Sequence, residues 1–526
     1  MTGRTGDLGP LRAQVRLLPW MGTVLLLGLL VRLPGLSAPL FEGAAGKQAH
    51  TAMVARNLAR GRCSWLRPMV DDVGKPGYFV KELPVVAGLA ALASRTTGAP
   101  LDATGRSIGI LAWLAGACVL AAILRRESTA ERAVLAAAWF VLAPAAIAYS
   151  RAFMTDPTMV AASVSALLLA LRWTDRPTPG RAMATGAATA AALLLKPHAA
   201  LWLAPALAVA TNTGAAHDLR RGTSEARAAR GWLVASLAIG VAIAAAWYAH
   251  AAAVHRAHPV PGAMVASGWV DPALWLSPAL WVRIARQLLE IVLTPAGLAL
   301  ALLAIAPGRE RFGRGELALL AWGAGVVAQS ALLGTRMFDD AARGTEYYQL
   351  PAVAPAAVLV ARGAERAAAL LRRGPSSVGA APAWLAAGLV LAAALTGVPA
   401  TRAIESAPEA YASLPEQCEK VRSLVRPEES LLVVADRPGI VLWECDRRGT
   451  TFTPATAMGN ASGSTRIAAA PDAMWRTLES VDRVFLPFPD LVPASLREWL
   501  DREWQRVPDD SVALWTKRPP SAGMRP

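Results

Sequence analysis

The chain has 526 residues, of which 54% are hydrophobic and only 17% are charged, and its mean hydropathy is +0.36. A soluble protein carries roughly a quarter charged residues, so this composition excludes an ordinary soluble globular protein. The apolar residues, mainly alanine, leucine and valine, occur in blocks of about twenty, the length that crosses the hydrocarbon core of a bilayer. The sequence therefore predicts an integral membrane protein.

The net charge of +15 comes mainly from arginines in the short links between the apolar blocks. This distribution is typical of the positive-inside rule, which sets the orientation of a membrane protein. A nucleic-acid-binding protein would combine its basic residues with aromatic ones, and no such platform accompanies the charge. We therefore expect membrane lipids, and no nucleic acid, among the partners of this chain.

After an N-terminal segment, 1–17, the apolar blocks predict about eleven transmembrane helices and hence an all-α polytopic membrane fold. They lie near residues 18–36, 106–124, 131–149, 157–173, 182–197, 199–212, 231–251, 286–306, 316–334, 348–364 and 382–400. If the N-terminus is cytoplasmic and every block crosses the membrane, all cytoplasmic links are rich in arginine. Because the arginine-rich links all fall on the cytoplasmic side in this arrangement, we predict an outer location for the C-terminal region.

The first outer loop, 37–105, is too polar to span a bilayer and too long for a passive connector. Its two short apolar runs, Thr51–Leu58 and Leu83–Ser94, predict helices that lie at the outer interface. Loops on a rigid scaffold are where binding and catalytic groups concentrate. The carboxylates, bases, cations and amide that make this loop a candidate site include Glu42, Lys47, Gln48, His50, Asp71, Asp72, Lys75, Lys81 and Glu82. A carboxylate among them could act as a general base toward an acceptor hydroxyl, although a solvated loop residue is the simpler interpretation of each one.

Later outer loops contain a second group of candidates, each with an ordinary structural alternative. Asp156, followed by Pro157, caps the predicted fourth span and could also face the first loop. Lys196 suits either a headgroup contact or a phosphate, as do Lys81 and Arg336. The paired Tyr347 and Tyr348 suit either an interfacial belt or the face of a sugar.

The composition changes after the predicted transmembrane domain, 18–401. Residues 402–526 contain charged helical stretches and the strand-like runs Leu431–Val434 and Arg483–Leu486, which predict a small outer α/β domain. Cys418 and Cys445 both lie in this domain, and in an oxidising compartment they either pair or remain free.

Motifs for bound metals and nucleotides are missing from the sequence. It contains no HExxH motif, no clustered cysteine and histidine spacing, no Walker A sequence and no GxGxxG loop. We therefore predict no metal site, and ATP-driven transport by this chain is not favoured.

Taken in order, the outer-loop motifs resemble the membrane glycosyltransferases of the GT-C fold. The closer likeness is to glycosyltransferase family 39, the branch that includes bacterial protein O-mannosyltransferases and the lipid A aminoarabinose transferases. The motifs that carry the resemblance, spread over residues 18–400, are AMVARNLARG at Ala52–Gly61, Tyr78-Phe79-Val80-Lys81 with Pro84, Arg151 to Asp156, Lys196-Pro197 and Tyr347-Tyr348-Gln349-Leu350-Pro351.

The resemblance implies a sugar transferase at the outer face of a bacterial cytoplasmic membrane. Its donor would be a polyprenyl-phosphate-linked sugar, and its acceptor a hydroxyl or amine on a lipid, a glycan or a protein. A base deprotonates the acceptor, which displaces polyprenyl phosphate with inversion, while cations stabilise the departing charge. Lys81 matches the family's phosphate-binding lysine and Asp156 its second acidic position. The resemblance implies no certain cofactor and leaves a divalent cation open.

One departure from the family pattern concerns the presumed base. The Asp-Glu pair expected before the interfacial helix falls on Lys47 and Gln48. One branch has Arg-Gln at this place and a Glu before the later proline, a pattern that Lys47-Gln48 and Glu82-Leu83-Pro84 resemble. The candidate catalytic residues are therefore Glu82, Asp156 and Glu42. The candidate substrate-binding residues are Lys47, Gln48, His50, Asp72, Lys81, Arg151, Lys196, Arg336, Tyr347 and Tyr348. A transporter or flippase of lipid-linked sugars and a non-catalytic scaffold of the same fold are the alternatives.

Overall fold

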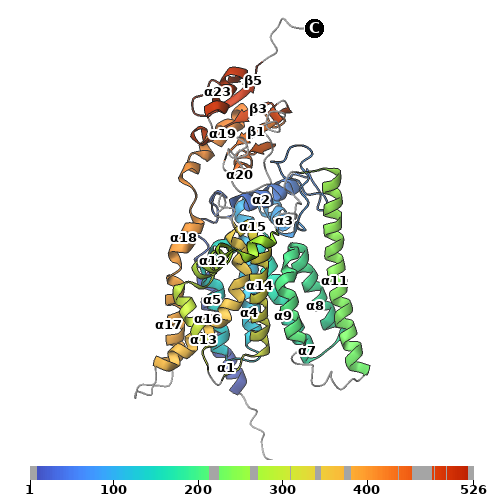
Figure 1. Ribbon diagram of the computed structural model, residues 1–526, viewed down its shortest axis with the longest axis vertical. Coiled ribbons are helices and arrows are strands. Elements are labelled where there is room, and N and C mark those ends of the chain that lie inside the picture. Colours follow the sequence, from blue (N-terminus) through green and yellow to red (C-terminus); the bar gives the residue numbers. More distant parts are fainter. Residues whose placement is uncertain are drawn as a thin grey trace, which may run out of the picture.

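The computed structural model shows a bundle of helices that carries a small α/β domain at one end (Figure 1). The first outer loop lies between these two parts, below the C-terminal domain and above the bundle. The structure describes residues 9–212, 224–260, 270–307, 310–337, 345–371, 381–435, 437–452, 477–478, 480–492 and 494–518.

Each of the predicted transmembrane segments contains at least part of a helix. The helices are α1 (Gly9–Leu30), α4 (Leu101–Leu124), α5 (Ala130–Leu142) with α6 (Pro144–Arg151), α7 (Asp156–Asp175), α8 (Pro179–Leu195), α9 (Ala200–Asn212), α11 (Ser224–Ala257), α12 (Pro278–Gln287) with η3 (Leu288–Leu293) and α13 (Pro295–Ile305), α14 (Arg314–Leu332), α16 (Val353–Leu371), and α17 (Ala381–Leu395) with α18 (Val398–Glu405). By length and composition, 4 of the described helices can cross a membrane, or up to 7 if each bent pair forms one span.

Several predicted spans are therefore shorter or more bent than the apolar blocks suggest. Pro144 and Pro295 each begin a new helix after a break, because proline cannot donate the hydrogen bond that would continue the preceding one. The axes at these breaks differ by 59° and 96°. Helices α8 and α9 have 17 and 13 residues. The membrane crossings are thus partly built from broken and short helices.

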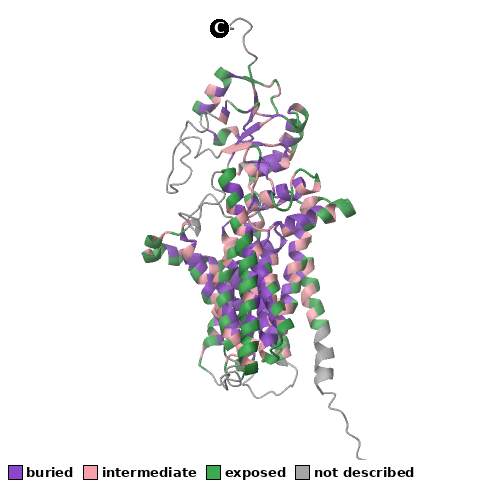
Figure 2. Cartoon of the chain, turned by 90° about the vertical axis from the view of Figure 1, so that its right-hand side faces the viewer, coloured by how far each residue is buried: buried purple, intermediate pink, exposed green. Residues whose placement is uncertain are grey.

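Buried residues fill the interior of the bundle, and exposed residues lie along its outer faces (Figure 2). Most of the large buried side chains are apolar, yet large hydrophobic side chains also remain exposed. Trp113, Trp139 and Trp322 are fully buried, while Leu111 and Val234 are more than half exposed. A water-soluble protein would cover such a surface, but lipid chains solvate it favourably. The exposure pattern therefore agrees with a membrane environment.

Two helices of the first outer loop lie where the sequence predicts interfacial helices. They are α2 (Ala45–Ala59) and α3 (Val85–Thr97). The segment between them is tied to the bundle, because Trp247 Nε1 donates to the carbonyl of Lys81 at 2.9 Å and Leu83 N donates to that of Leu194 at 3.0 Å. The loop is thus a structured platform at the end of the bundle.

The C-terminal domain is built on one mixed sheet, with the strand order β2-β1-β3-β5-β4. Its elements are α19 (Leu414–Leu424), β1 (Leu431–Val434), α20 (Pro438–Glu444), β2 (Gly449–Phe452), β3 (Arg483–Phe485), α23 (Ala494–Glu503), β4 (Trp504–Arg506) and β5 (Leu514–Lys517). β1 pairs in parallel with β2 and β3, and β5 is antiparallel to β3 and β4. A disulfide joins Cys418 to Cys445. The small α/β domain predicted from the sequence is present.

The first outer loop continues this sheet at its β2 edge. Gly449 N donates to the carbonyl of Asp71 at 2.8 Å, and Gly74 N donates to that of Gly449 at 2.9 Å. Val73 and Thr450 form an antiparallel bridge. Backbone hydrogen bonds therefore connect the C-terminal domain directly to the loop that carries the candidate residues.

Candidate active site

Two lysine–carboxylate pairs meet where the first outer loop covers the bundle. Lys47 on α2 pairs with Glu82, which precedes α3. Lys196, at the end of α8, pairs with Asp156 at the start of α7, with 2.5 Å between Nζ and Oδ1. Each pair thus joins two separate elements, and all four residues were predicted from the sequence.

The two pairs and Lys81 are close enough to influence one another's charge. Burial acts to raise the pKa of Glu82, but the positive charges of Lys47, Lys196 and Lys81 outweigh it and hold the pKa well below the ordinary value. Burial acts to lower the pKa of Lys47, and the charges of Glu82 and Asp156 raise it overall. Lys47 and Glu82 thus stay ionised, and within this cluster three lysines, Lys47, Lys81 and Lys196, face the two carboxylates of Glu82 and Asp156. One positive charge in excess favours an anionic ligand.

A pocket of about 420 Å³, open to solvent, lies beside these pairs. Its polar lining comes from α2, from the segment before α3 and from the start of α7: Lys47, His50, Thr51, Lys81, Glu82 and Thr155. Lys81 Nζ lies 4.2 Å from the centre of the Phe79 ring, which also lines the pocket. The pocket therefore combines cations, one carboxylate and an aromatic wall in a single concave site.

Two tyrosines from η4 (Glu346–Ala352) flank the second lysine. Lys196 Nζ lies 4.8 Å from the ring centre of Tyr347 and 5.5 Å from that of Tyr348. Cation–π attraction at these distances helps to hold the buried ammonium group. The predicted tyrosines therefore contact the charged cluster.

His50 links the pocket to a buried carboxylate behind it. His50 Nε2 lies 2.7 Å from Asp72 Oδ2, and Asp72 Oδ1 has no hydrogen-bond partner among the described residues. Gly439 of α20 packs against this pair, since a Cβ at that position would lie 2.7 Å from Asp72 Oδ2. The C-terminal domain thus closes the back of the site, a contact that no local sequence signal indicates.

Glu42 lies outside the pocket lining. Its two oxygens accept hydrogen bonds from Arg106 Nη2 at 2.8 Å and from Arg151 Nη2 at 2.6 Å. Nearby, Gln48 is fully buried and accepts a hydrogen bond from Phe153 N at 2.9 Å. These three predicted residues, Glu42, Arg151 and Gln48, fasten the start of the loop to the bundle.

The structure also shows what the sequence interpretation missed. Arg106 lies in an apolar helix, where nothing in the sequence predicts its contact with Glu42. Thr51, Phe79 and Thr155 line the pocket without belonging to a recognisable motif. The side chain of Arg336, a predicted cation, lies outside the described residues.

The resemblance leaves a divalent cation open, so the arrangement of possible metal ligands matters. In the parts of the chain that the structure describes, no three histidine, cysteine, aspartate or glutamate side chains converge as metal ligands. The carboxylates of the site are instead paired with lysine or histidine. We therefore assign no step of the chemistry to a metal.

Comparison with known proteins gives the class of this fold. A family model for dolichyl-phosphate-mannose-protein mannosyltransferases matches residues 104–259. No curated protein sequence matches the chain.

The solved structures extend the likeness to almost the whole chain. ArnT from Cupriavidus metallidurans, in its apo state, has a TM-score of 0.62 and 12% identity, and the match covers 94% of this chain and 97% of ArnT. The same protein bound to undecaprenyl phosphate has a TM-score of 0.58 and 14% identity, over 96% of this chain and 99% of ArnT. The oligosaccharyltransferase AglB from Archaeoglobus fulgidus, in complex with an inhibitory peptide and a dolichol-phosphate, has a TM-score of 0.53 and 15% identity, over 89% of this chain and 69% of AglB.

The chain therefore has the GT-C fold of membrane glycosyltransferases. The resemblance predicted from the outer-loop motifs is confirmed, and the fold is that of a multi-pass membrane protein.

Proposed function

We propose that this chain is a glycosyltransferase that moves a sugar from a polyprenyl-phosphate-linked donor to a hydroxyl or amine of an acceptor. The observation that carries the proposal is the pocket in which Lys47, Lys81 and Glu82 converge beside the Lys196–Asp156 pair. A GT-C fold and a structural likeness to ArnT bound to undecaprenyl phosphate support the choice of donor.

The lysines of the site hold the phosphate of the donor. Lys81 and Lys47 line the pocket, and Lys196 adds its charge from the adjoining pair. In this pocket, these cations stabilise the negative charge that develops on the phosphate as it leaves. The aromatic faces of Phe79, Tyr347 and Tyr348 suit the apolar side of a sugar ring.

Glu82 is the proposed base. The lysines keep its carboxylate ionised, and it lies in the pocket wall rather than behind it. The donor phosphate competes for Lys47, which frees a Glu82 oxygen for the acceptor. The acceptor oxygen or nitrogen forms a bond to the anomeric carbon, and the bond from that carbon to the phosphate oxygen breaks. Its electron pair leaves with polyprenyl phosphate, and the acceptor proton goes to Glu82. A single displacement of this kind inverts the anomeric centre.

Three further carboxylates have supporting roles in this proposal. Asp156 holds Lys196 toward the site through their 2.5 Å contact. Glu42 holds the loop through Arg106 and Arg151. Asp72 orients His50, which lines the pocket.

We place the reaction at the outer face of a bacterial cytoplasmic membrane. The arginine-rich links support a cytoplasmic N-terminus. The Cys418–Cys445 disulfide supports an oxidising, extracytoplasmic location for the C-terminal domain and the loop attached to it. The acceptor then belongs to the lipids, glycans or proteins of the cell envelope.

Mass spectrometry of envelope lipids, glycans and glycoproteins tests the proposal. The cells compared would carry the wild-type chain, no chain, Glu82→Gln, or Glu131→Gln as a matched control on the exposed face of α5. We expect one glycosylated product to disappear without the chain and with Glu82→Gln, and to remain with Glu131→Gln. An envelope unchanged by deletion of the chain would refute the transferase, whereas accumulation of an unflipped lipid-linked sugar would identify a transporter instead.

A further inference from the structure

A second pocket, rich in arginine, lies at the junction of the first outer loop and the C-terminal domain. It is open to solvent, encloses about 510 Å³ when the space at its mouth is included, and shares no lining residue with the candidate active site. Its lining residues are Arg56, Arg60, Arg62, Asp71, Pro427, Asp446, Arg447 and Arg448. The side chains come from α2 and the segment after it, from the link between α19 and β1, and from the turn between α20 and β2. Nothing in the proposed transfer reaction uses this pocket.

The charges of this arginine pocket do not balance. Its arginines exceed its two aspartates by three positive charges. Both aspartates are already fully engaged. Asp446 is held by Arg60 through two bonds of 2.8 and 2.7 Å, and Asp71 accepts from Arg56 at 2.8 Å and from Asn57 at 3.1 Å. The remaining charge therefore has no carboxylate of its own within the lining, although Glu428, Glu429 and Glu444 act on Arg447 and Arg56 from outside it.

Hydrogen-bond donors also remain for a ligand. The Arg62 guanidinium makes no hydrogen bond or ion pair to any described residue, and the residue is exposed. Arg448 reaches the carbonyl of Pro76 with Nη2 at 3.2 Å and Asp71 with Nε at 3.3 Å, which leaves its Nη1 available. A guanidinium fork of this kind matches the oxygens of a phosphate group in geometry and in charge.

We propose that the arginine pocket binds a phosphate-type oxyanion, with Arg62 and Arg448 as its direct ligands. The excess of three positive charges favours a doubly charged phosphate over a single carboxylate. Arg62 comes from the first outer loop and Arg448 from the C-terminal domain, so a bound phosphate bridges the two parts. The pocket is also distinct from the donor site, because Arg56 follows Lys47 by nine positions on α2, about 14 Å along the helix axis.

Binding to the purified full-length chain tests this inference without any transferase assay. The chain would be placed in nanodiscs of phosphatidylcholine, and inorganic phosphate titrated at constant ionic strength against chloride, with ³¹P NMR and thermal unfolding as readouts. We expect saturable binding and a phosphate-dependent rise in Tm. Arg62→Gln and Arg448→Gln should each weaken binding about tenfold, the effect of losing one charge-assisted hydrogen bond.

Arg95→Gln is the matched control, because Arg95 is an exposed arginine on α3 outside the pocket. Arg62→Gln removes a solvent-exposed side chain, so this variant tests binding even if Arg448→Gln disturbs the fold. Equal phosphate affinity in Arg62→Gln, Arg448→Gln and the wild type would overturn the inference. So would a Tm that rises equally with chloride.

A second set of nanodiscs, containing phosphatidylglycerol, distinguishes the source of the phosphate. If the lipid headgroup fills the pocket, the anionic nanodiscs raise the Tm of the wild type more than that of Arg62→Gln, and added phosphate has little further effect. If the ligand is soluble, the response to phosphate is the same in both lipids. If Arg62→Gln changes neither phosphate binding nor Tm in either lipid, both sources are excluded, and so is the pocket as a phosphate site. The inference stands or falls independently of the proposed transfer reaction.

Discussion

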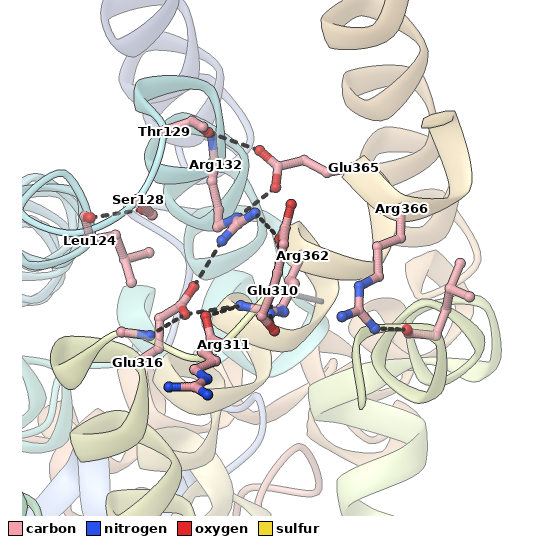
Figure 3. A network of polar contacts seen from close by, with 12 residues as sticks. Leu124, Ser128, Thr129, Arg132, Glu310, Arg311, Glu316, Arg362, Glu365 and Arg366 are labelled. Atoms are coloured by element: carbon pink, nitrogen blue, oxygen red, sulfur yellow. Dashed lines mark hydrogen bonds and ion pairs between the residues drawn. The ribbon is translucent and has the colours of Figure 1, made fainter. Parts of the chain in front are cut away.

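Buried charges gather at both ends of the helical bundle, and the two clusters are built differently. At the outer-loop end, lysines form single contacts with Glu82 and Asp156. At the opposite end, arginines of α5 and α16 are surrounded by glutamates and backbone carbonyls (Figure 3). Arg132 donates to Glu365 at 2.5 Å and to Glu310 at 3.0 Å.

Most polar atoms of the arginine network are engaged, although Arg362 Nε is buried without a hydrogen-bond partner among the described residues. Both oxygens of Glu316 are engaged, by Arg132 Nη1 at 3.4 Å and by Arg362 Nη1 at 3.1 Å, and Glu316 also accepts from Gly313 N at 2.9 Å. Arg366 donates to the carbonyls of Leu303 and Ala306. Forked guanidinium groups suit such fixed networks. This end of the bundle is therefore held in one arrangement.

The lysine cluster is incompletely satisfied by comparison. Asp156 Oδ2 and the neighbouring Thr155 hydroxyl are buried without a hydrogen-bond partner among the described residues. An ammonium group is a point charge that can change partners without a fixed geometry. Buried charge alone therefore does not indicate a functional site. Hydrogen-bonding capacity that remains unused beside a pocket does.

The largest expected effect is the loss of activity in Glu82→Gln. Removing a general base lowers kcat by about 10² to 10⁴-fold. The substitution also leaves Lys47 without its partner, so Lys47→Gln with Glu82→Gln serves as a second variant that restores neutrality. A transfer assay with purified protein should show the loss in both variants. Full activity in either one would remove Glu82 from the mechanism.

The next largest effect concerns the stability that the arginine network provides at the end of the bundle opposite the first outer loop. Glu316 is 3% exposed, and Glu316→Gln leaves two buried guanidinium groups without a shared carboxylate. We expect a loss of about 3 kcal/mol in the free energy of unfolding, as is usual when one partner of a buried pair is removed. Glu310→Gln is the control, because the Glu310 side chain is 61% exposed and such pairs contribute little. In thermal unfolding in detergent, Glu316→Gln should have a clearly lower Tm than Glu310→Gln. Equal Tm values would mean that the buried Glu316 contributes no more to stability than the exposed Glu310.

Much of the fold follows from local patterns in the sequence. The apolar blocks predicted where helices occur, and the short runs in the first outer loop predicted α2 and α3. Strands β1 and β3 were also predicted from their apolar runs, whereas β2, β4 and β5 were not, because Gly449–Phe452, Trp504–Arg506 and Leu514–Lys517 mix polar and apolar residues over only three or four positions. The helix breaks before Pro144 and Pro295 were not predicted, because the apolar blocks continue on both sides of them.

The site was predictable by residue type and only partly by arrangement. Lys47, His50, Lys81 and Glu82 belong to the same polar loop, 37–105, and lie around one pocket. Glu42 belongs to the same polar stretch, yet it is held between Arg106 and Arg151, which come from distant helices. Such pairings depend on how the helices pack, and a single sequence has no local signal for them. Catalytic roles for Glu82, Asp156 and Glu42 stay predictions.

A smaller effect is expected if the lysine cluster is made to resemble the arginine network. Lys196→Arg keeps the charge but allows a forked contact with Asp156, which fixes the cation in place. We expect stability to change by less than about 1.5 kcal/mol, as for volume changes that a core tolerates. Activity should fall about tenfold, because the planar guanidinium places its charge differently toward the phosphate than the ammonium group that Asp156 holds. Wild-type kcat and KM in this variant would show that the placement of this charge is unimportant.

The smallest effect is the response of the Lys47–Glu82 pair to pH. The pKa of Glu82 lies below its ordinary value of 4.5, so the carboxylate's contribution to stability is complete above that value and is lost as pH falls through the lower, folded-state pKa. The pKa of Lys47 lies above its ordinary value of 10.5, so its contribution is complete below that value and is lost as pH rises through the higher one. The Tm difference between the wild type and Lys47→Gln with Glu82→Gln should therefore stay constant from about pH 5 to about pH 9 and shrink only outside that range. A difference that titrates near neutral pH would mean that Glu82 is protonated there, and a neutral carboxyl could not serve as the ionised base of the proposed reaction.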